Sequence, residues 1–128
     1  MIKTYKPQKL TVALVKRKAR EAYKARKLTA QHRDPDKRLC VYSIGTYHCP
    51  IGAALSKEAL AQVKLKGDNS GAGVDILSKD GIITPLSARE WNQLDEIQSV
   101  HDSWAVKARC GLDVAYQRKI FRKLIGMN

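Results

Sequence analysis

The first apolar stripe lies near the start of the chain. Apolar residues recur there at steps of three and four positions, at Val12, Val15, Ala19, Ala22 and Tyr23. This spacing places them on one face of a helix. We therefore predict a helix over residues 9–31, followed by a turn around Pro35, a residue that cannot continue a helix.

A short β-like segment follows the turn. Residues 39–42 and 46–49 are rich in apolar, aromatic and β-branched types, and Ser43-Ile44-Gly45 separates them. Gly45 suits the positive φ that a tight hairpin turn requires. The pattern predicts a small β-hairpin, which must pack on helices because two strands alone are only marginally stable.

The middle of the chain alternates helical and loop signals. Pro50 suits the first turn of a helix, and we predict that this helix spans residues 50–63. The glycine-rich residues 67–73 are typical of a loop. After them, residues 74–77 suit one helical turn and Ile82-Ile83 a third short strand.

The clearest helix signal begins at Ser87. Ser87 and Glu90 form a capping box, in which each side chain accepts a hydrogen bond from the other residue's backbone. A helical stripe follows at Trp91, Leu94, Ile97, His101, Trp104 and Ala108. Gly111 then marks a break or bend, and a last helix is predicted over residues 112–125.

These elements predict one domain over residues 1–128, with residues 1–8 as a flexible N-terminal tip. The expected fold class is α+β and mostly helical, with about four helices packed with one small β-hairpin. A chain of 128 residues is long enough for one hydrophobic core but not for two.

Composition indicates a cytoplasmic protein that does not enter a membrane. The sequence has no run of about 18 apolar residues. Its first residues, Met1 to Pro7, contain no apolar leader segment. The three cysteines form an odd set without a CxxC motif, which fits a reducing compartment.

Charge is distributed unevenly along the chain. Residues 1–38 contain 13 Lys/Arg and 3 Asp/Glu, a net charge of +10. Residues 39–106 have a net charge of −3, and residues 107–128 of +5. The basic excess at the two ends exceeds what solubility needs. It predicts a polyanion or an acidic protein surface as the partner.

We interpret the chain as a basic, non-enzymatic binding module for nucleic acid or for a nucleic-acid-handling complex. No known recognition motif is visible, so contacts would go mainly to phosphates, with little sequence readout. The residues expected to bind are Lys16, Arg17, Arg20, Lys24, Arg26, Lys27, Arg118 and Arg122. Because both terminal helices must bury their apolar stripes on one core, we expect them to form a single basic face. A first alternative is an effector or inhibitor that binds an acidic surface of a host protein.

A second alternative is a small enzyme that uses Cys49 and His101. Cys49 precedes Pro50 at a helix start, where free backbone N–H groups favour the thiolate. His101 would then serve as the base. Asp102 points about 100° away from its neighbour on a helix, so we do not expect it to orient the imidazole. Both residues also fit a structural interpretation, as a small buried thiol and a histidine at the edge of the core.

Two further residue types bear on ligand binding. Gly52, in a first helical turn, permits close approach of another helix or of a bound anion. Cys40, His48, Cys49 and Cys110 are zinc-ligand types, but their spacing matches no usual zinc motif. We therefore expect no metal and no cofactor.

The central part of the chain resembles a group of small phage, prophage and plasmid proteins with no established activity. The likeness rests on Cys49-Pro50-Ile51-Gly52-Ala53-Ala54-Leu55 and on the later Gln98-Ser99-Val100-His101-Asp102, and it covers residues 40–104. In that group a Cys-x-Ile-Gly-Ala-Leu segment follows a hairpin, and a Gln-x-x-His-Asp helix comes later. This chain departs from the group at Pro50 and in its basic N-terminal helix. The resemblance implies a shared fold and a mobile-element origin in a bacterial host, not a mechanism.

Overall fold

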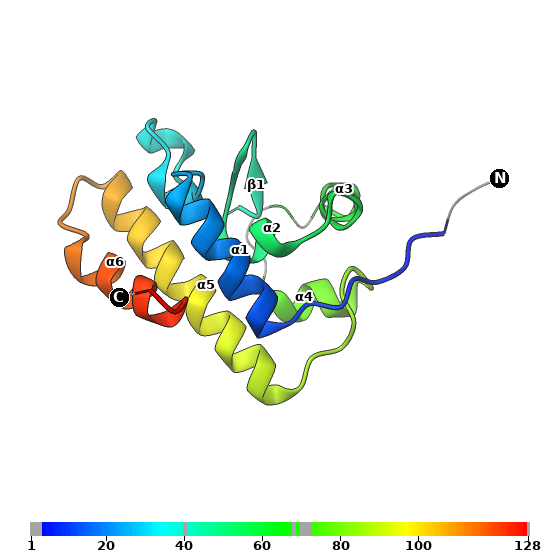
Figure 1. Ribbon diagram of the computed structural model, residues 1–128. Coiled ribbons are helices and arrows are strands. Elements are labelled where there is room, and N and C mark those ends of the chain that lie inside the picture. Colours follow the sequence, from blue (N-terminus) through cyan, green and yellow to red (C-terminus); the bar gives the residue numbers. More distant parts are fainter. Residues whose placement is uncertain (1–3, 40, 68, 70–72, 128) are drawn as a thin grey trace.

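The computed structural model describes residues 4–39, 41–67, 69 and 73–127. Within these ranges the chain forms six α-helices and one antiparallel hairpin, which confirms a mostly helical α+β fold (Figure 1). The helices are α1 Val12–Lys24, α2 Pro50–Ala54, α3 Lys57–Leu65, α4 Val74–Lys79, α5 Ala88–Arg109 and α6 Ala115–Leu124. Two 3₁₀ turns, η1 Thr29–Gln31 and η2 Pro35–Lys37, precede the strands β1 Ser43–Ile44 and β2 Tyr47–His48.

The longest helix, α5, is the centre of the fold. Both α1 and α6 pack against it, and α2 packs on α1 (Figure 1). The buried side chains form one hydrophobic cluster to which all six helices contribute. The stripe predicted for α5 is buried from Leu94 through Ile97 and His101 to Trp104, whereas Trp91 is 36% exposed.

The first helix is shorter than predicted. It ends at Lys24 instead of residue 31, because Arg26 adopts a left-handed φ of 57°. The Lys27 N–H then donates to the Ala22 carbonyl, as in a common helix-terminating motif. The chain therefore turns away from α1 and reaches α5 through η1.

The hairpin is confirmed, but its turn lies later than expected. Ser43 pairs with His48 and Ile44 with Tyr47, so Ser43 and Ile44 belong to a strand. Gly45, at φ +60°, supplies the turn.

Two other boundaries differ from the prediction. The helix expected over residues 50–63 is divided into α2 and α3, since Leu55 is extended and Ser56 caps a new helix by accepting the Ala59 N–H. The strand expected at Ile82-Ile83 is a single parallel bridge between Ile83 and Gln8. Most of the predicted loop at 67–73 lies outside the described residues.

The helices around Ser87 and Gly111 follow the prediction. Ser87 and Glu90 form the capping box of α5. Gly111 has a φ of +73° directly after this helix, and α6 begins four residues later.

The N-terminal segment is attached to the rest of the molecule from Tyr5 onward. The Tyr5 hydroxyl donates to the Ile82 carbonyl at 2.6 Å. The Gln8 side chain donates to the Ala54 carbonyl and accepts from the Ser56 N–H. These bonds argue against a flexible tip over the described residues 4–8.

Candidate functional site: a basic cavity between α1, α5 and α6

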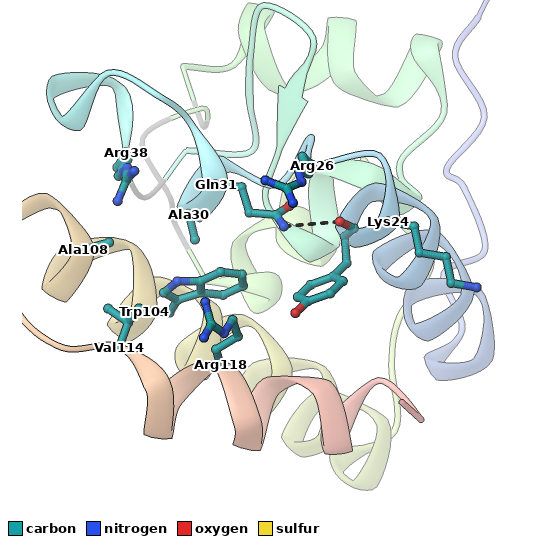
Figure 2. A pocket seen from close by; sticks show the side chains of 10 residues that line it. Lys24, Arg26, Ala30, Gln31, Arg38, Trp104, Ala108, Val114 and Arg118 are labelled. Carbon is teal, nitrogen blue, oxygen red and sulfur yellow. Dashed lines mark hydrogen bonds between the residues drawn. The ribbon is translucent and has the colours of Figure 1, made fainter. Parts of the chain in front are cut away.

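The basic segments of the two chain ends meet at one cavity of about 480 Å³ (Figure 2). This volume falls within the range of small-molecule sites in proteins. We call it the central cavity, and it is lined by Tyr23, Lys24, Arg26, Ala30, Gln31, Arg38, Trp104, Ala108, Val114 and Arg118. Its residues come from α1, the segment that follows α1, α5 and α6.

Charge at this cavity is uncompensated. Arg26 and Arg118 are exposed at its rim and Arg38 is half-buried, whereas the Lys24 amine is directed away from the cavity (Figure 2). None of the four forms an ion pair with a carboxylate in the described part of the chain. Cations grouped in this way, with no carboxylate partner among the described residues, attract an anion.

The floor of the cavity is apolar and aromatic. Trp104 is 4% exposed and Ala30 2%, while Ala108 and Val114 are half-buried. The Tyr23 ring lies 6.1 Å from the Trp104 ring, centroid to centroid. The cavity therefore combines a cationic rim with a hydrophobic base, an arrangement suited to a ligand that has both an anionic and a flat apolar part.

Contacts with two other elements hold the segment after α1 in place. The His48 N–H of β2 donates to the Lys27 carbonyl at 2.9 Å. The Ala30 N–H donates to the His101 Nε2 of α5 at 3.2 Å. These bonds fix the chain between Arg26 and Gln31 above Trp104.

Backbone strain occurs at the rim of the cavity. Arg26 is the one non-glycine residue with positive φ in the described ranges. This conformation costs an ordinary residue about 1–2 kcal/mol. Hydrogen bonds from the Lys27 N–H and from the Gln31 side chain stabilise this conformation. The positive φ turns the main chain at Arg26 away from α1 and toward the cavity.

The two terminal basic helices lie next to each other, as the single-face prediction requires. The Arg20 guanidinium of α1 donates to the Ile125 carbonyl, just after α6, at 2.7 Å. The Arg122 guanidinium of α6 lies 5.6 Å from the Tyr23 ring centroid. Arg20 therefore has a structural contact in addition to its charge.

The predicted binding residues divide into three groups. Lys24, Arg26 and Arg118 line the central cavity. Lys27 and Arg122 line two smaller hollows beside it. Lys16, Arg17 and Arg20 lie further along α1 and line none of the three.

Sequence reasoning missed several residues of this site. Arg38 lies after the turn at Pro35, beyond the predicted stripe, and a bond from its Nε to the His32 carbonyl at 2.6 Å holds its side chain at the cavity. The periodicity of α5 predicts Trp104 as a core residue, and only the packing of three segments makes it part of a cavity lining. The net charge of residues 1–38 was the signal that pointed to this region.

Cys49 does not have the properties of a nucleophile. Its side chain is fully buried, and this burial raises the pKa of the thiol to about 12, although the Gly52 N–H donates to its Sγ at 3.3 Å. The expectation that the helix start favours the thiolate is therefore wrong. Hydrogen bonds from the Gly52 and Ile51 backbone and from the Gln98 side chain favour the thiolate, but they do not offset the loss of solvent around a charge.

His101 is a buried structural residue, and Asp102 does contact it. Since the His101 Nε2 accepts the Ala30 N–H, the ring hydrogen is on Nδ1, which lies 3.1 Å from the Asp102 Oδ1. The expectation that Asp102 cannot orient its neighbour is wrong, because the carboxylate folds back along the helix. Gln98 also donates to Asp102 and accepts from the Ile51 N–H, which links α5 to α2.

Position 52 requires a glycine because the main chain that enters the hairpin packs directly against it. A Cβ at this position would lie 1.8 Å from the Tyr42 carbonyl oxygen. Its N–H is directed at Cys49 and the residue is buried, so it is not open to an anion. The close neighbour is thus a main chain, not the helix or anion that was expected.

The described residues meet neither the requirements of a metal site nor those of a membrane-spanning helix. No group of three or more His, Cys, Asp or Glu side chains is arranged there to hold a metal ion, and Cys40 lies outside these ranges. None of the described helices has the length and apolar character needed to span a bilayer.

The fold and the cavity define the chain as a mostly helical α+β protein with a basic site that has no carboxylate partner among the described residues. No protein-family model, curated protein sequence or solved structure matches it.

Proposed function

We propose that this protein is a non-enzymatic module that binds nucleic acid through phosphate contacts at the central cavity and the basic surface around it. One observation supports this above all. Arginines from both ends of the sequence, Arg26 and Arg38 on one side and Arg118 on the other, lie around one cavity and have no carboxylate partner in the described ranges (Figure 2).

The chemistry of the rim fits phosphate. Three of its four cations are arginines, whose planar guanidinium groups match the oxygens of a phosphate with two parallel hydrogen bonds. Gln31 offers little to a base edge, because its amide donates to the Tyr23 carbonyl and accepts from the Leu28 N–H. Binding of this kind depends on charge and discriminates weakly between sequences.

The enzyme alternative is not supported, since its nucleophile would be the buried Cys49. The alternative of an acidic protein partner shares the same cations. The resemblance to phage and plasmid proteins favours a bacterial host as the setting for either partner.

A salt series tests the proposal. Binding of the full chain to a random-sequence single strand and to a duplex is measured by fluorescence anisotropy between about 50 and 200 mM salt. If four phosphates are contacted, the affinity falls with a log–log slope of about −3 to −4. Undetectable binding at 50 mM salt, or binding that does not change with salt, would contradict the proposal and leave an acidic protein as the partner to test.

Matched variants locate the site. Arg38→Ala and Arg118→Ala should each weaken binding several-fold and reduce the salt slope by about one. Lys57→Ala on α3 and Arg89→Ala on α5 remove exposed cations away from the cavity. These controls should bind almost as the original protein does. Circular dichroism must show that all four variants remain folded.

A further inference from the structure

Three hollows follow one another across the basic face. The α6 hollow, of about 290 Å³, is lined by Ala115, Arg118, Lys119, Arg122 and Lys123. It shares Arg118 with the central cavity. The hairpin hollow, of about 310 Å³, is lined by Ala25, Arg26, Lys27, Gln31, Arg33 and Tyr47, and shares Arg26 and Gln31 with the central cavity.

Because the central cavity shares residues with each of the other two, the three hollows are neighbours, and we call them together the trough. Nine of its lining residues are Lys or Arg, and none is Asp or Glu. A trough of one charge that is longer than any single cavity suits an extended polyanion better than a compact anion.

Aromatic side chains lie between the cations along this trough. Trp104 and Tyr23 line the central cavity, and Tyr47 lines the hairpin hollow. The Tyr47 ring contacts the His32 ring at a centroid distance of 4.2 Å, and the Lys27 Nζ lies 4.8 Å from its centroid. Alternating cations and aromatic rings form the usual binding surface for single-stranded nucleic acid.

The depth of the aromatic floor distinguishes a single strand from a duplex. Trp104 is 4% exposed, so neighbouring side chains cover most of its ring, and a base that enters the cavity contacts it by displacing them. In a duplex the bases are paired and stacked inside, and the phosphates alone would meet the rim. In a single strand an unstacked base is free to enter while its phosphates remain with Arg26, Arg38 and Arg118 (Figure 2).

We infer that the trough binds single-stranded nucleic acid, with its phosphates along the nine cations and one base inserted against the Trp104 floor. This inference rests on the proposed function and adds the strand type and the base contact. With the Gln31 amide already hydrogen-bonded to the backbone, the inserted base is held by its flat surface and not by its edge.

The fluorescence of Trp104 serves as the readout for base insertion. The chain has two tryptophans, and Trp91 lines a separate hollow with Leu86 and Ala88, so Trp91→Phe leaves Trp104 as the only one. This variant is titrated with a thymidine strand of about 12 nucleotides, with an abasic strand of equal length and with the corresponding duplex. We expect the base-bearing strand to quench Trp104 and to bind about tenfold more tightly than the abasic strand.

A second variant fills the floor without changing any charge. Ala108→Leu should abolish the preference for the base-bearing strand while the affinity for the abasic strand stays the same. Ala13→Leu, at an exposed position of α1 outside the three hollows, is the matched control and should retain the preference.

The outcomes separate the two proposals. Equal, salt-dependent affinity for the base-bearing and abasic strands, or tighter binding of the duplex, would overturn base insertion and leave the proposed function intact. Thymidine monophosphate that binds as tightly as the strand would overturn the trough in favour of a single-nucleotide site. Failure of every nucleic acid to bind would overturn both proposals.

Discussion

At the scale of single residues, Cys49 shows how burial decides the protonation state of a thiol. Its Sγ accepts the Gly52 N–H in the first turn of α2, a contact that lowers a thiol pKa. Complete burial acts in the opposite direction and is stronger, with a further contribution from the negative charge of Asp102. The result is a neutral thiol that acts as a small apolar side chain of the core.

This leads to a prediction about alkylation. Because the pKa of Cys49 is raised to about 12, native protein should leave it unmodified by iodoacetamide from pH 7 to pH 9, while the exposed Cys110 reacts. Peptide mass spectrometry measures the two sites separately, and protein unfolded in urea is the control in which both react. Rapid modification of Cys49 at pH 7 in folded protein would restore the enzyme alternative.

At the scale of elements, a main-chain contact joins α2 to the chain that enters the hairpin. The Cys49 N–H donates to the Tyr42 carbonyl at 3.4 Å, and Gly52 packs directly on the same carbonyl. The parallel bridge between Leu28 and His48 then connects the hairpin to the chain after α1. Through these contacts, the packing of α2 influences where Arg26 and Gln31 lie.

Gly52→Ala should therefore destabilise the fold. The added Cβ would lie 1.8 Å from a backbone oxygen, which no side-chain rotation relieves. We expect a loss of at least about 2 kcal/mol in the free energy of unfolding, measured by urea denaturation.

Gly73→Ala is the matched control for this substitution. Its Cβ would meet only the end of the Asp75 side chain, which is free to rotate away. The expected loss is about 1 kcal/mol or less. Similar losses for the two variants would contradict the packing argument for Gly52.

At the scale of the whole molecule, the basic face has a cost in stability. The chain has a net charge of +12, and nine cations line the trough without a carboxylate among them. Like charges held close together repel one another in the folded state, and salt screens this repulsion. Binding sites commonly reduce stability in this way.

Removing one of these cations should stabilise the free protein at low salt. We expect Arg118→Gln to raise the free energy of unfolding by about 0.5 kcal/mol at about 20 mM salt, and the gain to disappear near 0.5 M. Lys64→Gln, an exposed lysine in the last turn of α3 within the region of net charge −3, should give no gain. Chemical denaturation at the two salt concentrations provides the measurement. A gain for Arg118→Gln that is independent of salt would contradict the repulsion argument.

Sequence alone determined the features that depend on local physics. The Ser87–Glu90 capping box, Pro50 in the first turn of α2 and the glycine turns all involve residues close together in the chain, so local spacing was sufficient. The excess of basic residues at both ends also requires no structure, since charge is a property of composition. That excess lies in the two segments from which the cations of the central cavity come.

Tertiary structure alone decided the features that depend on distant residues. The course of the chain after α1 is set by bonds of Lys27 and Ala30 to His48 and His101, which lie far along the chain. The Cys49 thiol is neutral because the surrounding core removes water, an effect that overrides its place at a helix start. The central cavity likewise exists only because Lys24, Trp104 and Arg118, from three separate helices, are packed around one space, and no spacing along the sequence encodes that meeting.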